Sequence, residues 1–194
     1  GRMICQWDET NDVWNAVYIV GNAFNSIVQY GGNLYAAFAD GTAYVYGSTT
    51  SWTTSIIVAP GQDANFFRVS RGTLWKGISA SVDSTNHGIY SSTNPINGGS
   101  WSSVYTLGSV DTDITGLYDI ADTLVIGKEE GLHVYKRVYN DGTSADLFEN
   151  LTNEYIVSQS TDNFARGQEF HGWLYLATAQ QGLLRYRPGQ IEAS

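Results

Sequence analysis

The chain has 194 residues, of which 42% are hydrophobic, 13% aromatic and 15% charged, and its formal net charge is −9. Disordered chains are rich in charge and poor in aromatic residues, so this composition excludes disorder and predicts a folded domain. Lys and Arg number 10 against 19 Asp and Glu, and no basic stripe for phosphates is present, so we expect no nucleic-acid partner. No apolar run approaches the roughly 20 residues of a spanning helix, so we expect no membrane insertion.

The first predicted unit, residues 14–47, contains four runs that are typical of β-strands. Trp14 precedes the run 16–20, and the runs 26–30 and 33–38 flank the turn Gly31-Gly32. A last run with Tyr44 and Tyr46 follows Gly41. Val, Ile, Tyr and Trp favour a pleated, half-buried surface, and the glycines favour tight turns between the runs. This stretch is therefore expected to form antiparallel strands.

Three further units, 52–91, 101–137 and 150–187, repeat this order. The run after the tight turn carries a leucine in each unit, at positions 34, 74, 124 and 174, so the intervals are 40, 50 and 50 residues. Trp52 and Trp101 stand where Trp14 does, and either 147–148 or 155–157 substitutes for the missing tryptophan of the last unit. The leucines and the tryptophans are independent markers, and because both recur at matching intervals they indicate a structural repeat.

Short strands with tight turns at this period predict an all-β fold, a single-domain β-propeller over residues 1–194 with four-stranded antiparallel blades. Such a sheet leaves both faces uncovered, so it must pack against its neighbours. We expect four blades, with residues near 14–20 supplying the outer strand that the last unit lacks. Residues 3–7 are typical of a further strand, which a closed four-blade ring does not need. A segment of a larger propeller is therefore the alternative.

Two repeat families resemble parts of this chain. Residues 174–186, Leu-Tyr-Leu-Ala-Thr-Ala-Gln-Gln-Gly-Leu-Leu-Arg-Tyr, resemble the repeat of two-component-regulator propellers, and 124–135 match it nearly as well. Residues 91–101 resemble the Asp-box of sialidase-type (BNR) repeats, with Asn94 in the place of the Asp and an insertion, and 48–52 form a more degenerate copy. Both resemblances imply propeller architecture. They imply no single function, because enzymes, lectins and scaffolds share these repeats.

The sequence carries few signals of catalysis or of metal binding. A sialidase-like site would need clustered arginines, but the arginines fall at unrelated positions of the repeat, and no nucleophile elbow surrounds any serine. The oxygen-rich stretches 8–12 and 111–113 are typical of exposed loops, and neither has the spacing of a calcium loop. We therefore expect no cofactor, with Ca²⁺ or another cation as the alternative. Cys5 is the single cysteine, so no internal disulfide can form.

Candidate ligand residues emerge from the register of the repeat. In a propeller, the loops that enter the inner strands line the mouth of the central channel. Counting 11 residues back from the four leucines reaches Ala23, Asp63, Asp113 and Asn163, and counting 12 back reaches Asn22, Gln62, Thr112 and Asp162. Together with Asp40, His87, Glu129 and Gln180 in the neighbouring loops, these residues predict a polar rim for a cation, a sugar or a cationic peptide. Asp and Asn also cap backbone amides in turns, which is the alternative role for the same residues.

We therefore expect a non-catalytic recognition or assembly module that binds a glycan, a peptide or a cation at this rim. Convergent loops on a rigid ring suit recognition better than bond cleavage. The alternatives are a glycan-active hydrolase of the sialidase type and a purely structural propeller fragment. The expected partners are a glycan or protein ligand and other domains of a longer chain. The cell surface, a virion and the extracellular space are the favoured locations, and the cytosol stays open.

Overall fold

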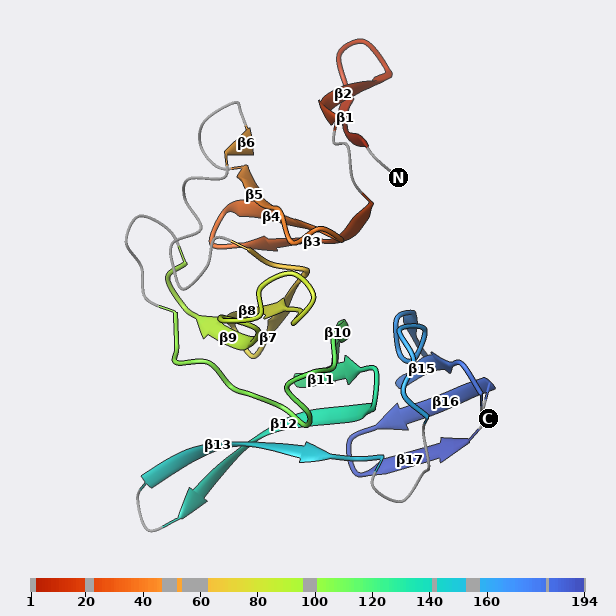
Figure 1. The fold of residues 1–194 in the computed structure, drawn as a ribbon. Coiled ribbons are helices and arrows are strands. Elements are labelled where there is room, and N and C mark those ends of the chain that lie inside the picture. The colour runs from red at the N-terminus through yellow and green to blue at the C-terminus, as the bar shows by residue number, and fades with distance from the viewer. Residues whose placement is uncertain are drawn as a thin grey trace.

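The computed structural model describes residues 3–19, 23–46, 52–53, 63–95, 101–140, 143–152, 158–180 and 182–193. Every regular element in these residues is a β-strand, and the strands form five antiparallel sheets (Figure 1). The all-β prediction is confirmed. The expected strands at 55–58 and 155–157 lie outside the described residues, as do 48–51 and 98–100 of the Asp-box-like stretches. None of the described residues belongs to a helix long and apolar enough to cross a bilayer.

Four sheets consist of strands that are consecutive in the chain, and we number the sheets first to fourth. The first sheet contains β3 (Phe24–Tyr30), β4 (Asn33–Phe38), β5 (Ala43–Tyr46) and β6 (Trp52–Thr53). The second contains β7 (Phe66–Ser70), β8 (Thr73–Ile78) and β9 (Gly88–Ser92). The third contains β10 (Ile114–Ile120), β11 (Thr123–Lys128), β12 (Gly131–Asn140) and β13 (Thr143–Asn150). The fourth contains β14 (Gly167–Phe170), β15 (Trp173–Thr178), β16 (Gly182–Arg187) and β17 (Gln190–Ala193).

The repeat leucines occupy equivalent places in the four sheets. Each is the second residue of the second strand, and each pairs with the penultimate residue of the first strand, as in Leu74 with Val69 and Leu124 with Asp119. The turn between these strands has two central residues with positive φ, as in Gly31-Gly32 and His171-Gly172. This backbone is that of a type I′ hairpin turn, whose twist matches the twist of the flanking strands. The periodicity seen in the sequence is therefore a periodicity of structure.

The tryptophan-led runs close the sheet before them. Trp52 lies in β6, which pairs with β5. The segment that begins at Trp101 follows β9, with Ser102 N–H donating to Ser91 O at 2.8 Å and a bridge between Ile89 and Tyr105. In the third sheet the expected substitute 147–148 lies in the outer strand β13. Each sheet therefore starts one strand later than the unit expected from the sequence. It ends with the strand that was expected to begin the next unit.

The expected closure of the last sheet by residues 14–20 is wrong. The chain turns back at Gly189, whose φ is +85°, and β17 then pairs with β16 as the outer strand of the fourth sheet. Residues 13–19 instead form β2 (Val13–Ile19), which pairs with β1 (Met3–Asp8) in a separate hairpin. The Asp8 carboxylate closes that hairpin, because it accepts hydrogen bonds from the backbone amides of Thr10 and Asn11.

The four larger sheets follow one another in an arc with their first strands toward a common centre (Figure 1). β3 packs against β7, β7 against β10, and β10 against β14. Each junction has its own buried core: Tyr35 with Phe67, Trp75 with Leu124, and Val125 with Leu176 lie in separate clusters. Packing of each sheet on its neighbours, which we expected because such a sheet leaves both faces uncovered, is confirmed. At the ends of the arc large apolar side chains stay exposed, including Phe170 of β14 at 61%.

Candidate functional site

The described residues of the predicted rim lie at one end of the sheets, which we call the loop end, while Asn22 and Gln62 lie outside the described residues. This end holds the segments that lead into the first strands and the connections between second and third strands. Asp63, Asp113, Asp162 and Asn163 precede first strands, and Asp40, His87, Glu129 and Gln180 lie in the connections. Residues more than 100 positions apart in the sequence are therefore brought to the same end, as the register predicted.

Asn163 links two sheets through its side-chain amide. It is fully buried, its Nδ2 donates to the carbonyls of Glu129 at 2.8 Å and Ser158 at 2.7 Å, and its Oδ1 accepts from Ala179 N–H at 2.9 Å. Glu129 belongs to the third sheet's connection and Ala179 to the fourth's. The amide thus satisfies backbone groups of both sheets, which is the turn-capping role considered for this residue.

Asn65 makes the same link two junctions earlier, between the first and second sheets. Its Nδ2 donates to Ala39 O at 3.1 Å, and its Oδ1 accepts from Ser79 N–H at 2.7 Å. Counting back from Leu74 reached Asp63 instead, because the segment from this asparagine to the leucine is two residues shorter in the second sheet than in the fourth. An asparagine immediately before a predicted first strand is the signal that would have found it.

Asp113 holds the junction between the second and third sheets with a carboxylate. Its Oδ1 accepts from Ser81 N–H at 2.9 Å and its Oδ2 accepts from the Ser81 hydroxyl, while its carbonyl accepts from Glu129 N–H at 3.1 Å. The Glu129 side chain is buried and accepts from Gln159 Nε2 at 2.9 Å. These predicted ligand groups therefore already bind protein groups and stiffen the loop end.

The remaining predicted residues lie nearer the surface. Asp40 accepts from the amide and the hydroxyl of Thr42, His87 Nδ1 lies 3.1 Å from Ser84 O, and Gln180 accepts from Ser158. Asp162 is exposed. Asp63 is half-buried, and its pKa is raised by burial and by repulsion from Asp83 and Asp40, against the attraction of Lys76. The carboxylates of this end therefore repel one another.

Negative charge dominates the surface of the loop end. The described carboxylates there all lie in loops outside the strands and are Asp40, Asp63, Asp83, Asp111, Asp113, Glu129, Glu130 and Asp162. The two lysines at this end, Lys76 and Lys128, are buried, and Lys128 Nζ donates to Leu107 O and Ser109 O at 2.6 Å each. A shallow hollow of about 410 Å³ lies among His87, Asp111, Asp113 and Glu129. The described residues contain no group of three or more His, Cys, Asp or Glu that would hold a metal ion.

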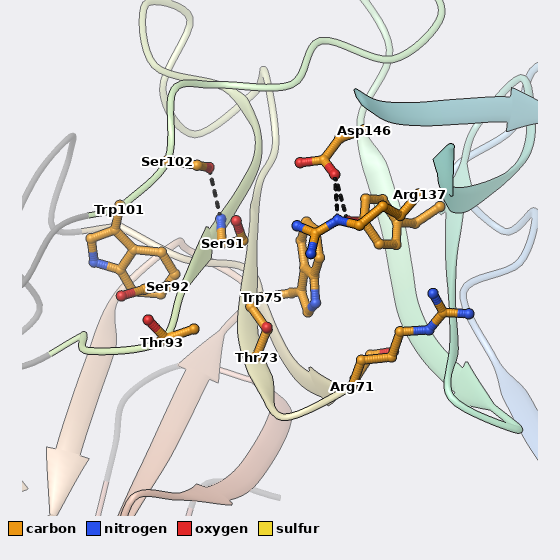
Figure 2. Close-up of a pocket in the computed structure, with 12 residues that line it drawn as sticks. Arg71, Thr73, Trp75, Ser91, Ser92, Thr93, Trp101, Ser102, Arg137 and Asp146 are labelled. Carbon is orange, nitrogen blue, oxygen red and sulfur yellow. Dashed lines mark hydrogen bonds and ion pairs between the residues drawn. The ribbon is translucent and has the colours of Figure 1, made fainter. Parts of the chain in front are cut away.

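A second hollow, also about 410 Å³, lies at the opposite end of the sheets, between the second and third sheets (Figure 2). We call it the inter-sheet pocket. Trp75 of β8 lies at its centre, with Arg71 and Arg137 to one side and Trp101, Ser92 and Thr93 to the other. The residues that line it include six serines and threonines: Ser70, Thr73, Ser91, Ser92, Thr93 and Ser102.

One wall of the inter-sheet pocket rests on an aromatic cluster. The ring of Trp75 lies 4.8 Å from that of Tyr135, and Tyr105 and Phe148 pack beside them. Asp146 joins the edge of the cluster by accepting from the hydroxyls of Tyr105 and Tyr135 at 2.7 Å each and from Arg137 Nε at 3.2 Å. Burial opposes ionisation of Asp146, but the hydrogen bonds from Tyr135, Tyr105 and Arg137 outweigh it and hold its pKa below the usual value.

Sequence reasoning missed the inter-sheet pocket because two sheets supply its walls. Trp75 itself belongs to the core between the second and third sheets. The signal that was available is the arginine in the Arg71-Gly72 turn, where the other three turns carry no arginine.

Comparisons with known proteins agree with this architecture at the level of the fold. No family model matches the chain, and no curated protein matches it. Among solved structures, the crystal structure of the N-terminal domain of Nup159, a β-propeller, is similar to this chain with a TM-score of 0.56 and 10% sequence identity. The chain has a β-propeller-type fold. The match covers 98% of this chain and 57% of that one, so the chain spans little more than half of the Nup159 domain.

Proposed function

We propose that the four larger sheets are consecutive four-stranded blades of a propeller ring that contains more than four blades. The segment that starts at Trp101 would be the outer strand of the second blade, because it follows β9 through Ser102 and Tyr105. The hairpin of β1 and β2 would be the outer pair of a preceding blade. Two observations support an arc over a closed ring: β17 completes the fourth sheet without help, and the Nup159 domain extends well beyond the match.

We further propose that the protein is a non-catalytic recognition module that binds a cationic partner at the loop end. The observation that carries this proposal is the concentration there of eight of the 19 acidic residues, of which Glu129 is buried, while both lysines of that end are buried and Arg166 is the one exposed basic residue among the described residues of that end. Clasps such as Asn163 and Asp113 make the frame rigid, which lowers the ordering cost of binding. A basic peptide segment is the partner that such a surface attracts, and the attraction would weaken with salt.

Fluorescence anisotropy of a labelled lysine-rich peptide tests the proposed recognition surface. The variant Asp111→Asn/Asp162→Asn removes two exposed charges from the loop end. Two exposed ion pairs contribute about 0.2–1 kcal/mol each, so we expect binding to weaken about 2- to 30-fold at low salt. The matched control, Asp122→Asn/Glu169→Gln, removes two exposed charges from the opposite end and should leave the affinity unchanged. Equal weakening by both variants would show attraction to net charge alone and contradict the proposed surface.

A further inference from the structure

Residues that line the inter-sheet pocket carry hydrogen-bond donors that the protein itself leaves unsatisfied, although the Trp101 indole nitrogen faces away from Trp75 (Figure 2). Among the described residues, six buried side-chain polar atoms lack a hydrogen-bond partner, and three of them belong to residues that line this pocket: Ser70 Oγ, Trp75 Nε1 and Trp101 Nε1. These side chains belong to residues that are 3%, 4% and 9% exposed. A buried donor without a partner costs about 1–3 kcal/mol, so native proteins seldom keep several together without a water, an ion or a ligand to accept from them.

Arg71 adds a charged donor at the rim of the same pocket. Its φ of +51° in the turn before Gly72 directs the side chain across to the third sheet, where Nε donates to Asp122 O at 2.6 Å. That bond occupies one nitrogen and fixes the guanidinium on the third-sheet side of Trp75, while the Arg137 guanidinium lies next to Trp75 (Figure 2). A guanidinium held in this way presents two parallel N–H groups, the geometry that suits a carboxylate.

The pocket is positive although the protein is strongly acidic. Its charged residues are Arg71, Arg137 and Asp146, and the carboxylate of Asp146 is already occupied by two tyrosine hydroxyls and Arg137. The chain as a whole carries a charge of −9 and repels anions. The local positive field of the inter-sheet pocket therefore attracts an anion where the rest of the surface does not.

We propose that the inter-sheet pocket binds a small sugar acid, a ligand with one carboxylate on a hydroxylated ring. Arg71 pairs with the carboxylate, the Trp75 indole N–H and the Ser70 hydroxyl donate to ring or hydroxyl oxygens, and the hydroxyl of Thr93 exchanges hydrogen bonds with the sugar hydroxyls. A volume of about 410 Å³ is in the range of pockets for small molecules and holds such a ligand. This site is separate from the loop end, lies at the opposite end of the sheets and takes the opposite charge.

Titration of ¹⁵N-labelled protein with glucuronate tests the proposal. The Trp75 Nε1–H signal, assigned with Trp75→Phe, should move downfield as the indole gains an acceptor. Glucose, which lacks the carboxylate, should bind at least 10-fold more weakly, and so should N-acetylglutamate, which lacks the hydroxylated ring. Tight binding of glucose would contradict the role of the arginines. Equal binding of N-acetylglutamate would replace the sugar acid by a peptide carboxylate and overturn the proposal.

Arg71→Gln should weaken glucuronate binding about 10-fold, since a charge-assisted bidentate contact is lost. Arg187→Gln is the matched control, because Arg187 is exposed on β16 in the fourth sheet, outside this pocket. If Arg71→Gln fails to fold, the wild-type protein still tests the proposal. A Trp75 Nε1–H signal that does not shift at saturating glucuronate would show that the inter-sheet pocket does not bind this ligand. A negative result for glucuronate would not bear on the recognition proposed at the loop end, because that proposal is tested with a lysine-rich peptide and with substitutions of other residues.

Discussion

His133 is a buried imidazole that should govern how stability changes in mild acid. It lies in β12, its Nε2 has no hydrogen-bond partner in the described part of the chain, and burial, with the nearby Lys128 and against the attraction of Glu130, lowers its pKa to about 4. The unfolded chain binds this proton near pH 6.5. Protons therefore bind the unfolded state first, and stability present above pH 6.5 is lost as the pH falls toward 4.

The expected loss from His133 is about 3 kcal/mol between pH 6.5 and pH 4, measured by urea unfolding at a series of pH values. His133→Leu removes the titrating group without breaking a side-chain hydrogen bond of the Nε2 atom, so the loss that His133 causes over this window should be absent from the variant. Asp146 and Asp83, whose pKa values are also lowered, act below the window and are shared by both proteins. An unchanged slope in the variant would show that other groups carry the dependence.

At the scale of single residues, the sequence predicted where the rim residues lie better than what they do. The register placed Asp113 and Asn163 at the loop end, where they are found. Their hydrogen bonds to Ser81 and Ala179 were not predictable, because each partner belongs to a connection of irregular length. The unsatisfied indole nitrogens of Trp75 and Trp101 were hidden for the same reason: orientation depends on the neighbouring sheet.

At the scale of the element, the turn between β10 and β11 departs from its three counterparts. Ala121 and Asp122 have φ values of +48° and +58°, whereas the second position is glycine in the other turns. A side chain in this left-handed region costs roughly 1–2 kcal/mol, and somewhat less for Asp. Ala121→Asn/Asp122→Gly installs the pair that type I′ turns prefer, so it should stabilise the protein by about 1 kcal/mol in thermal unfolding.

Gly172→Ala is the reverse experiment on the corresponding turn of the fourth sheet. The glycine has a φ of +75°, and a Cβ there would meet no atom within 4 Å, so any loss of stability is conformational. We expect a loss of about 1 kcal/mol. If the Asn-Gly variant gains nothing while Gly172→Ala costs stability, the left-handed strain at Ala121 and Asp122 has been offset by contacts of their side chains.

Elements were predictable from the sequence where the pattern is local. Two-residue turns before each leucine and alternating apolar runs identified the first three strands of each sheet, since both signals lie within a few residues. The outer strands were harder, because they carry only a tryptophan or a Leu-Phe pair as a marker. Trp14 misled for this reason: its run pairs with β1, and its side chain is 67% exposed beside Trp7.

At the scale of the whole molecule, the spacing between the two ends of the arc separates an arc from a closed ring. The penultimate residues of the first strands occupy equivalent positions, and they include Gln29, Asp119 and Glu169. In a closed ring of four, spin labels at Gln29→Cys and Glu169→Cys would be as far apart as labels at Asp119→Cys and Glu169→Cys. We expect a longer distance for the first pair in double electron–electron resonance.

Both labelled pairs need the background Cys5→Ser, because the native cysteine is exposed and would take up the label. Equal distances for the two pairs would restore the ring that the sequence favoured. The sequence could not decide this point, since periodicity reports the repeat and not the angle between successive repeats. That angle depends on side chains such as Phe67 and Trp75 at each junction.

Each of the four larger sheets is made from one uninterrupted stretch of chain. A ribosome therefore releases every residue of a sheet before it begins the next, and all strand partners are already present when the stretch emerges. Only the junction cores must wait for the following stretch. Synthesis can thus add finished sheets one at a time, and an early error in one of them does not trap strands that belong to another.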